Sequence, residues 1–220
     1  MGYPELRRRL MQQTVSTGRL PAEYQEVEWI ESHGTEYINT NINQEDFGFY
    51  IKFISNDEIS TTSFGCIMGG RYASNSSDFQ LSSYTTDANY NNGWRGTFRY
   101  GGSSQTYNAH LNDKGVLNEI EYHPDTDVYS ANGSDYASYA DGTISNTRYV
   151  YLFALHNNQS ATQHAKVRLY SFKVFRSGQL FADFVPCYRK ADGVIGLYDI
   201  LNDNFRTNAG SGTFTKGGNV

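Results

Sequence analysis

Apolar and polar residues alternate with a period of two along much of this chain. The odd-numbered positions from Phe47 to Phe53 are all apolar, and Gly, Tyr and Lys lie between them. Successive side chains of a strand point to opposite faces, so this pattern predicts a strand with one buried face. Similar runs, bounded by turn residues, predict strands over residues 24–31, 35–42, 47–53, 64–68, 78–84, 94–100, 116–122, 126–130, 149–155, 166–175, 180–188 and 194–201, with a last short run at Phe205.

Strand signals are most closely spaced between Lys166 and Thr215. In the first of these strands, Val167 and Leu169 share one face, whereas Tyr170, Phe172 and Val174 share the other. This change of parity predicts either a β-bulge or a strand that is covered on both faces. We expect residues 180–205 to return as a hairpin, pair with the first forty residues of the domain and close the fold.

The same patterns predict an all-β fold. No stretch of the domain keeps helical periodicity over three turns, and Asn132-Gly133 is a strong hairpin signal. Aromatic residues make up 15% of the 220 residues, with 18 Tyr and 13 Phe, and such rings pack well on pleated sheets. We therefore predict one domain over residues 20–220, a two-sheet antiparallel jelly-roll sandwich.

Residues 1–19 differ from this domain. Their apolar stripe is narrow and suits a short helical or extended segment, which would be marginal on its own. We interpret the segment as a linker and a docking element for a partner or for a second copy of the chain; an unanchored terminus is the alternative. The proposed docking residues are Leu6, Arg7, Arg8, Arg9, Leu10 and Met11.

Charge and cysteine content narrow the possible partners. The formal net charge is −5 and no basic stripe recurs, which argues against nucleic acid as a partner. No apolar run is long enough for a membrane span or a signal peptide, so we expect no membrane partner; either the N-terminus is trimmed or the protein reaches its place without the secretory route. We expect Cys66 and Cys187 to be two buried thiols, with a single disulfide as the alternative.

Three segments resemble the laminin-G-like and concanavalin A-like jelly rolls. Val128-Tyr-Ser-Ala-Asn-Gly133 is similar to their signature hairpin, and Ala165-Lys-Val-Arg-Leu-Tyr170 is similar to their closing strand. The strand Arg148-Tyr-Val-Tyr-Leu-Phe-Ala154 also matches, with Phe153 where these domains usually have Gly. The resemblance implies the same two-sheet sandwich.

Two end motifs resemble, more specifically, jelly-roll domains common in phage and prophage structural proteins of gut bacteria. They are the opening stretch from Leu20 to Thr40 and the closing stretch from Phe184 to Asp199, followed by residues 208–214. The resemblance implies a non-enzymatic virion surface protein, a head or tail fibre or a decoration protein, that is assembled in the host cytoplasm. Its N-terminal segment would bind other virion proteins, and a homo-oligomer is compatible with this role.

Fold alone does not give a ligand, but in such a protein the jelly roll would contact glycans on the bacterial surface or in mucus. Aromatic rings stack on sugar faces while amides and guanidinium groups bind hydroxyls. The densest cluster of such residues comprises Tyr84, Tyr90, Asn92, Trp94, Arg95 and Tyr107. The alternative is that Trp94 packs inward, in which case the protein is a structural assembly module with no sugar site.

The sequence also offers residues for two further chemistries. Some laminin-G-like domains bind calcium, and Asp78, Asp87, Asn89, Asp125 and Asp127 offer oxygen ligands, although they are also ordinary turn formers; we therefore assign no metal site and no cofactor. The stretch Glu26-Val-Glu28-Trp-Ile-Glu31 resembles the motif of retaining β-glucanases, so a β-glycan hydrolase using Glu26 and Glu31 is a third hypothesis. Regular alternation puts these two acids on opposite faces, so we predict no catalytic residues.

Overall fold

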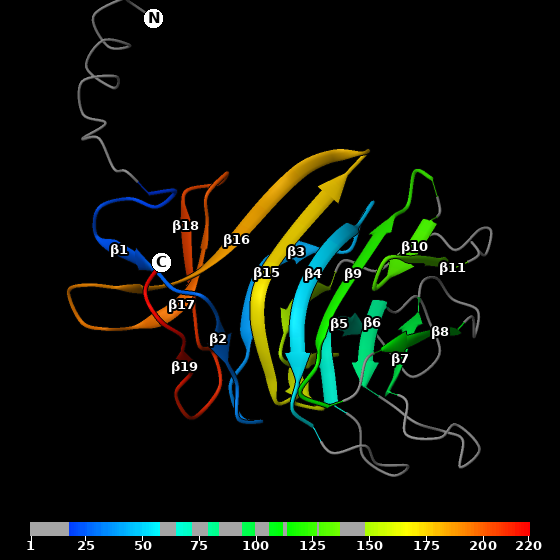
Figure 1. Cartoon of the computed structure of the whole chain (residues 1–220), viewed down its shortest axis with the longest axis horizontal. Helices are drawn as coiled ribbons and strands as arrows, with labels where there is room; N and C mark the ends of the chain where they lie inside the picture. Colours follow the sequence, from blue (N-terminus) through cyan, green and yellow to red (C-terminus); the bar gives the residue numbers. More distant parts are fainter. Residues whose placement is uncertain are drawn as a thin grey trace, which may run out of the picture.

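A computed structural model describes residues 18–57, 65–71, 79–83, 94–99, 106–111, 114–126, 128–136 and 148–220, and within these ranges every regular element is a strand. The strands form two sheets that pack as a sandwich (Figure 1). This confirms the predicted all-β, two-sheet class. The docking residues between Leu6 and Met11 lie outside the described ranges.

The larger sheet has 11 strands and the smaller has eight. The large sheet contains β1 (Tyr24–Glu26), β2 (Ile30–Glu31), β4 (Gly48–Ser55), β9 (Leu117–His123), β10 (Val128–Ala131), β11 (Ser134–Tyr136), β15 (Val167–Arg176), β16 (Gln179–Arg189), β17 (Ile195–Asp199), β18 (Asn204–Thr207) and β19 (Thr215–Lys216). The small sheet contains β3 (Ile38–Asn43), β5 (Gly65–Arg71), β6 (Phe79–Ser83), β7 (Trp94–Arg99), β8 (Thr106–Leu111), β12 (Tyr149–Leu152), β13 (Leu155–Asn157) and β14 (Ser160–Thr162).

The core lies between the inner faces of the two sheets. On β4, Phe49, Ile51 and Phe53 are fully buried, whereas the residues between them are partly exposed on the outer face. Phe49 meets Phe79 of the small sheet edge to face, with ring centroids 5.3 Å apart. Burial of each such side chain stabilises the fold by roughly 1.5–3 kcal/mol, so the alternation along β4 fixes which face looks outward.

Strand β15 contains the predicted bulge. Its pairing with β4 shifts register between Leu169 and Ser171. The shift brings Val167 and Leu169, before it, and Phe172 and Val174, after it, to the same buried face. Consequently Tyr170 and Ser171 are both partly exposed, as a bulge allows.

Strands β15 and β16 separate beyond this bulge. They pair from Arg176–Gln179 to Phe172–Phe184 and no further. Beyond that point β15 pairs with β2 and β16 pairs with β1. The carbonyl of Pro186 accepts a hydrogen bond from the Val27 amide at 3.0 Å, on the side of β16 that faces away from β17. The N–H and C=O of a strand residue point to the same side, and proline has no N–H to donate there. Proline therefore ends the β15–β16 pairing at this fork.

The prediction of a single strand over residues 24–31 is wrong in one respect. This stretch passes from β16 to β15 across the fork and is divided into β1, which pairs with β16, and β2, which pairs with β15. The expected closure of the fold is confirmed, because β1 pairs with β16. Strand β2 also pairs with β19, near the C-terminus. The two end motifs of the sequence thus meet in one part of the large sheet (Figure 1).

Two local conformations connect sequence to fold. Asn132 and Gly133 have φ of 52° and 79°, the left-handed conformation that a two-residue type I′ hairpin requires, and they join β10 to β11 as predicted. Phe153 has φ of 67° and is 1% exposed. A buried phenylalanine therefore occupies a left-handed position at which the resembling domains carry glycine.

Candidate functional site

The outer face of the large sheet brings one row of polar residues together across neighbouring strands. Tyr50 of β4 lies directly opposite Glu121 of β9 on one side and Lys173 of β15 on the other. Lys173 in turn lies opposite Asp183 of β16. Directly opposite side chains in an antiparallel sheet are within contact range, so this row carries an acid, a phenol, an ammonium group and a second acid.

Adjacent rows extend this surface. Lys52 is paired with Ser171 on β15 and with Glu119 on β9, and its ammonium lies 2.6 Å from the Glu119 carboxylate. In the row beyond Tyr50, Gly48 lies opposite Phe175. A side chain at Gly48 would meet the Phe175 Cβ at 3.3 Å, so this position must stay small.

The Phe175 ring of β15 contacts the His123 ring of β9 across β4, where Gly48 carries no side chain. Their ring centroids are 4.8 Å apart. A His123 ring nitrogen lies 2.6 Å from Glu121 Oε1. The aromatic ring of Phe175 is therefore supported on the outer face, beside Glu121.

Residues that precede β1 cover one side of this surface. Leu20 is 5% exposed and packs with Val185, Cys187 and Tyr198 on the outer face of β16 and β17. This packing covers β16 and β17 but stops short of β4 and β9. The edge of the covering layer, between covered β16 and uncovered β4, makes one wall of a groove.

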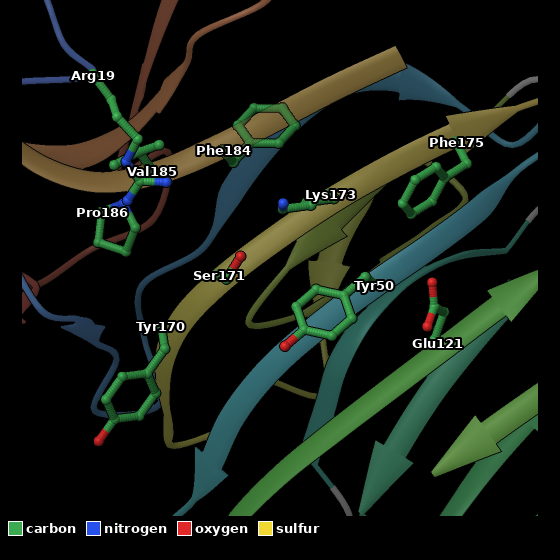
Figure 2. Close-up of a pocket in the computed structure, with 10 residues that line it drawn as sticks. All are labelled: Arg19, Tyr50, Glu121, Tyr170, Ser171, Lys173, Phe175, Phe184, Val185 and Pro186. Carbon is green, nitrogen blue, oxygen red and sulfur yellow. The ribbon is translucent and has the colours of Figure 1, made fainter. Parts of the chain in front are cut away.

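The groove runs along the edge of this covering layer and along the fork between β15 and β16. Its volume is about 480 Å³. Figure 2 shows Lys173 and Tyr50 between Glu121 on one side and Arg19, Val185 and Pro186 on the other. The lining residues are Arg19, Tyr50, Glu121, Tyr170, Ser171, Lys173, Phe175, Phe184, Val185 and Pro186.

The charges around the groove are paired. Arg19 forms an ion pair with Glu26, and the hydrogen bond to Glu26 raises the pKa of Arg19. Lys173 Nζ lies 3.8 Å from Asp183 Oδ2. Burial raises the pKa of Asp183, and the nearby Lys173 opposes this shift. Burial also raises the pKa of Tyr50, followed by the effect of the nearby Glu119 carboxylate, so Tyr50 keeps its phenol proton.

These groups suit binding better than catalysis. Partly exposed aromatic rings, hydroxyls and charged donors converge on one open groove, as in sites that hold a polar ligand by its faces and edges. The hydrolase hypothesis needs two carboxyls about 5–5.5 Å apart on one substrate. Glu26 and Glu31 instead lie on β1 and β2, which pair with β16 and β15, respectively.

Both of these carboxylates also have arginine partners. Glu26 is paired with Arg19, and Glu31 accepts hydrogen bonds from Arg168 Nη2 at 2.9 Å and from Asn56 Nδ2 at 2.7 Å. Arg168 stacks on Trp29 as well, 4.1 Å from the ring centroid. Glu31 therefore stabilises the start of β15, and this geometry favours structural roles for both acids.

Part of the glycan cluster suggested by the sequence lies outside the described residues, namely Tyr84, Tyr90 and Asn92. Trp94 and Arg95 belong to β7 and Tyr107 to the adjacent β8, with Tyr107 opposite Phe98. These strands are part of the small sheet, whereas the groove lies on the large sheet. The proposed cluster stays a prediction, separate from the groove.

The groove was not recognised in the sequence. The available signal was that outward positions of the predicted strands 47–53, 116–122 and 166–175 carry Tyr50, Glu121 and Lys173. That these strands are neighbours is a property of the sheet order alone.

Other chemistry is limited within the described ranges. No group of three or more His, Cys, Asp or Glu there is arranged to hold a metal ion. Of the calcium candidates, Asp125 is described, and Asp78, Asp87, Asn89 and Asp127 lie outside. No helix in this part of the chain has the length and apolar character to cross a membrane.

Comparison with known proteins gives the fold class. No protein-family model matches the chain, and no curated protein matches its sequence. A putative carbohydrate-binding protein from Bacteroides ovatus has a TM-score of 0.55 at 12% identity, covering 89% of this chain and 62% of that protein. The heptameric SAP-like pentraxin of Limulus polyphemus has a TM-score of 0.50 at 10% identity, covering 88% of this chain and 94% of the pentraxin.

The CBM40 of the Ruminococcus gnavus IT-sialidase is more distant in structure, with a TM-score of 0.46 at 16% identity over 74% of this chain and 94% of that module. At such identities, likeness to the first two structures establishes a shared fold and says nothing about a ligand. The chain is thus an all-β sandwich of the jelly-roll class.

Proposed function

We propose that this chain is a glycan-binding, non-catalytic jelly-roll module and that the groove on the outer face of the large sheet holds the saccharide. The observation that carries the proposal is the convergence of Tyr50, Tyr170 and Phe175 with Arg19 and Lys173 around one open groove. A volume of about 480 Å³ is in the range of small-ligand sites, roughly 300–1,000 Å³.

The chemistry of the lining matches a sugar. A pyranose has an apolar face of C–H groups and an equator of hydroxyls, and the Tyr50 ring offers a surface for the first. Charged hydrogen bonds to hydroxyls are available from Lys173 and Glu121, directly opposite Tyr50 on the neighbouring strands. The structural likeness to the putative carbohydrate-binding protein from Bacteroides ovatus supports the same function.

We further propose that the module is displayed on a phage virion, as a head or tail fibre or a decoration protein, and contacts glycans of the bacterial surface or mucus. In this proposal the N-terminal segment docks onto other virion proteins. The support is the sequence resemblance of the two end motifs, which lie together in strands β1, β2, β16 and β17. A purely structural virion module is the competing function.

A glycan array with three variants tests the binding function. Wild-type protein should bind a defined set of glycans, and Tyr50→Ala should weaken binding about tenfold, because a stacked ring contributes roughly 0.5–1.5 kcal/mol beyond the area it buries. Tyr149→Ala is the matched control, since Tyr149 is an exposed tyrosine of the small sheet. Unchanged melting temperatures would show that each variant is folded.

Trp94→Ala separates the groove from the cluster suggested by the sequence. Binding that depends on Trp94 and not on Tyr50 would move the site to the small sheet and overturn the groove proposal. Silence across a broad array, together with capture of capsid or tail proteins, would favour the structural module.

A deletion tests the virion proposal. Removing residues 1–17 retains Arg19 and therefore the groove. The truncated protein should fold and bind glycans as before but fail to enter virions. Normal incorporation of the truncated protein would refute the docking role of Leu6 to Met11.

A further inference from the structure

At one end of the groove, two basic side chains are more exposed to solvent than the acidic side chains that they pair with. The Arg19 side chain is 57% exposed, whereas that of its partner Glu26 is 15% exposed. Lys173 is 36% exposed and its partner Asp183 is 10% exposed. A ligand entering the groove at this end therefore meets the guanidinium and ammonium groups before it meets the acids.

Several hydrogen-bond donors at this end are unused among the described residues. Lys173 Nζ donates no hydrogen bond there, because its distance of 3.8 Å from Asp183 exceeds hydrogen-bonding range. Arg19 donates to Glu26 through Nε and Nη2, which leaves Nη1 available. Ser171 contributes a hydroxyl, and Figure 2 shows it beside Lys173, facing the same groove.

The surroundings strengthen any ionic contact made at this position. Val185 and Pro186 form the adjacent apolar wall, and Tyr50 lies on the other side. Charge-assisted hydrogen bonds are roughly twice as strong as neutral ones, and partial removal from water raises their strength further. Asp183 lies 3.8 Å from Lys173 Nζ, beyond hydrogen-bonding range, so the ammonium can donate its hydrogen bonds to a ligand.

The opposite end of the groove has the opposite character. Glu121 lies on β9, beyond Tyr50 as seen from Lys173, and its side chain is 43% exposed. Within the groove, a negative group is therefore attracted to the Arg19–Lys173 end and repelled by Glu121, so the groove favours a ligand that places one negative group at that end.

We propose that the saccharide bound in the groove is acidic, with one carboxylate or sulfate group held by Arg19, Ser171 and Lys173 and its uncharged hydroxyls directed toward Glu121. This inference rests on the proposed glycan-binding function and specifies its ligand class. Carboxylate and sulfate present the same acceptor chemistry to these donors, so the experiment must distinguish them.

Two pairs of polysaccharides provide that test. Polygalacturonate is compared with its fully methyl-esterified form, and dextran sulfate is compared with dextran, by biolayer interferometry on the full chain. The charged member of at least one pair should bind about tenfold more tightly than its neutral counterpart, and its affinity should fall as salt is raised. The pair that shows this difference identifies carboxylate or sulfate as the bound group.

Charge variants locate the contact. Lys173→Gln and Arg19→Gln should each weaken binding of the acidic polymer about tenfold, while the control Lys190→Gln, which removes an exposed charge outside the groove, should not. Asp183→Asn should strengthen binding about threefold, because it releases Lys173 from its only acidic partner among the described residues. A gain of affinity is a result that damage to the fold would not produce.

The outcomes separate the two proposals. Equal binding of charged and neutral polymers with dependence on Tyr50 would overturn the acidic ligand and keep the glycan-binding function. Acidic binding that is insensitive to Lys173→Gln and Arg19→Gln would also overturn it. Absence of binding to these polymers and to every glycan of the array would refute both.

Discussion

Phe153 offers a direct test of the backbone geometry, because the structure places a buried aromatic residue at a left-handed position. Its φ is 67°, its exposure is 1%, and its ring lies 5.0 Å from that of Phe214. The backbone at Phe153 is also fixed on both sides, by hydrogen bonds to Ile67 at 2.7 Å and from Ala165 at 2.9 Å. The residue therefore combines favourable packing with conformational strain.

The two contributions can be separated by comparing Phe153→Ala with Phe153→Gly. Loss of the ring should cost about 3–5 kcal/mol in either variant. A left-handed conformation costs a residue with a Cβ roughly 1–2 kcal/mol, which glycine avoids. Glycine loses about 0.5–1 kcal/mol more than alanine through the greater freedom of its unfolded chain. Phe153→Gly should therefore be more stable than Phe153→Ala by up to about 1.5 kcal/mol, although both are less stable than wild type.

Urea unfolding followed by intrinsic fluorescence measures these free energies. Phe172 provides the control, since it is also fully buried but does not have positive φ. At Phe172 the order should reverse, with the glycine variant less stable than the alanine variant. A Phe153→Gly protein that is less stable than Phe153→Ala would refute the strain argument.

Two further predictions concern buried titratable groups. Burial alone would raise the pKa of Glu36, but amide hydrogen bonds from His33 at 2.7 Å and Thr35 at 3.3 Å outweigh it, so the pKa is lowered. The stability that Glu36 contributes is therefore fully present above its unfolded pKa and is lost as the pH falls through its folded pKa. When the free energy of unfolding is measured at decreasing pH, Glu36→Gln should lose less stability than wild type. Equal losses in the two proteins would contradict this. Burial raises the pKa of Cys187 to about 12 and Cys66 is also buried, so a thiol reagent should label neither in the native protein and both after unfolding.

Local patterns in the sequence predicted those parts of the fold that local physics decides. The alternation from Phe47 to Phe53 gave β4 and its buried face, and Asn132-Gly133 gave the hairpin between β10 and β11. The parity change along β15 predicted the bulge near Tyr170. Each of these features depends on residues close together in the chain.

Features that depend on distant partners were not predictable in this way. The division of residues 24–31 into β1 and β2 follows from the fork at Pro186, which the local alternation does not contain. The hairpin of β13 and β14 was missed because its residues are mostly polar and exposed or partly exposed. The groove required the order β9–β4–β15–β16, which no local pattern specifies.

The most direct test of the groove as the glycan site is an NMR titration of the isotope-labelled chain with a saccharide selected on the array. If the groove binds the saccharide, saturable backbone amide shifts should concentrate at Tyr50, Glu121, Ser171 and Lys173, and they should be lost in Tyr50→Ala. Shifts concentrated at Trp94 and Tyr107, with none in the groove, would contradict binding in the groove.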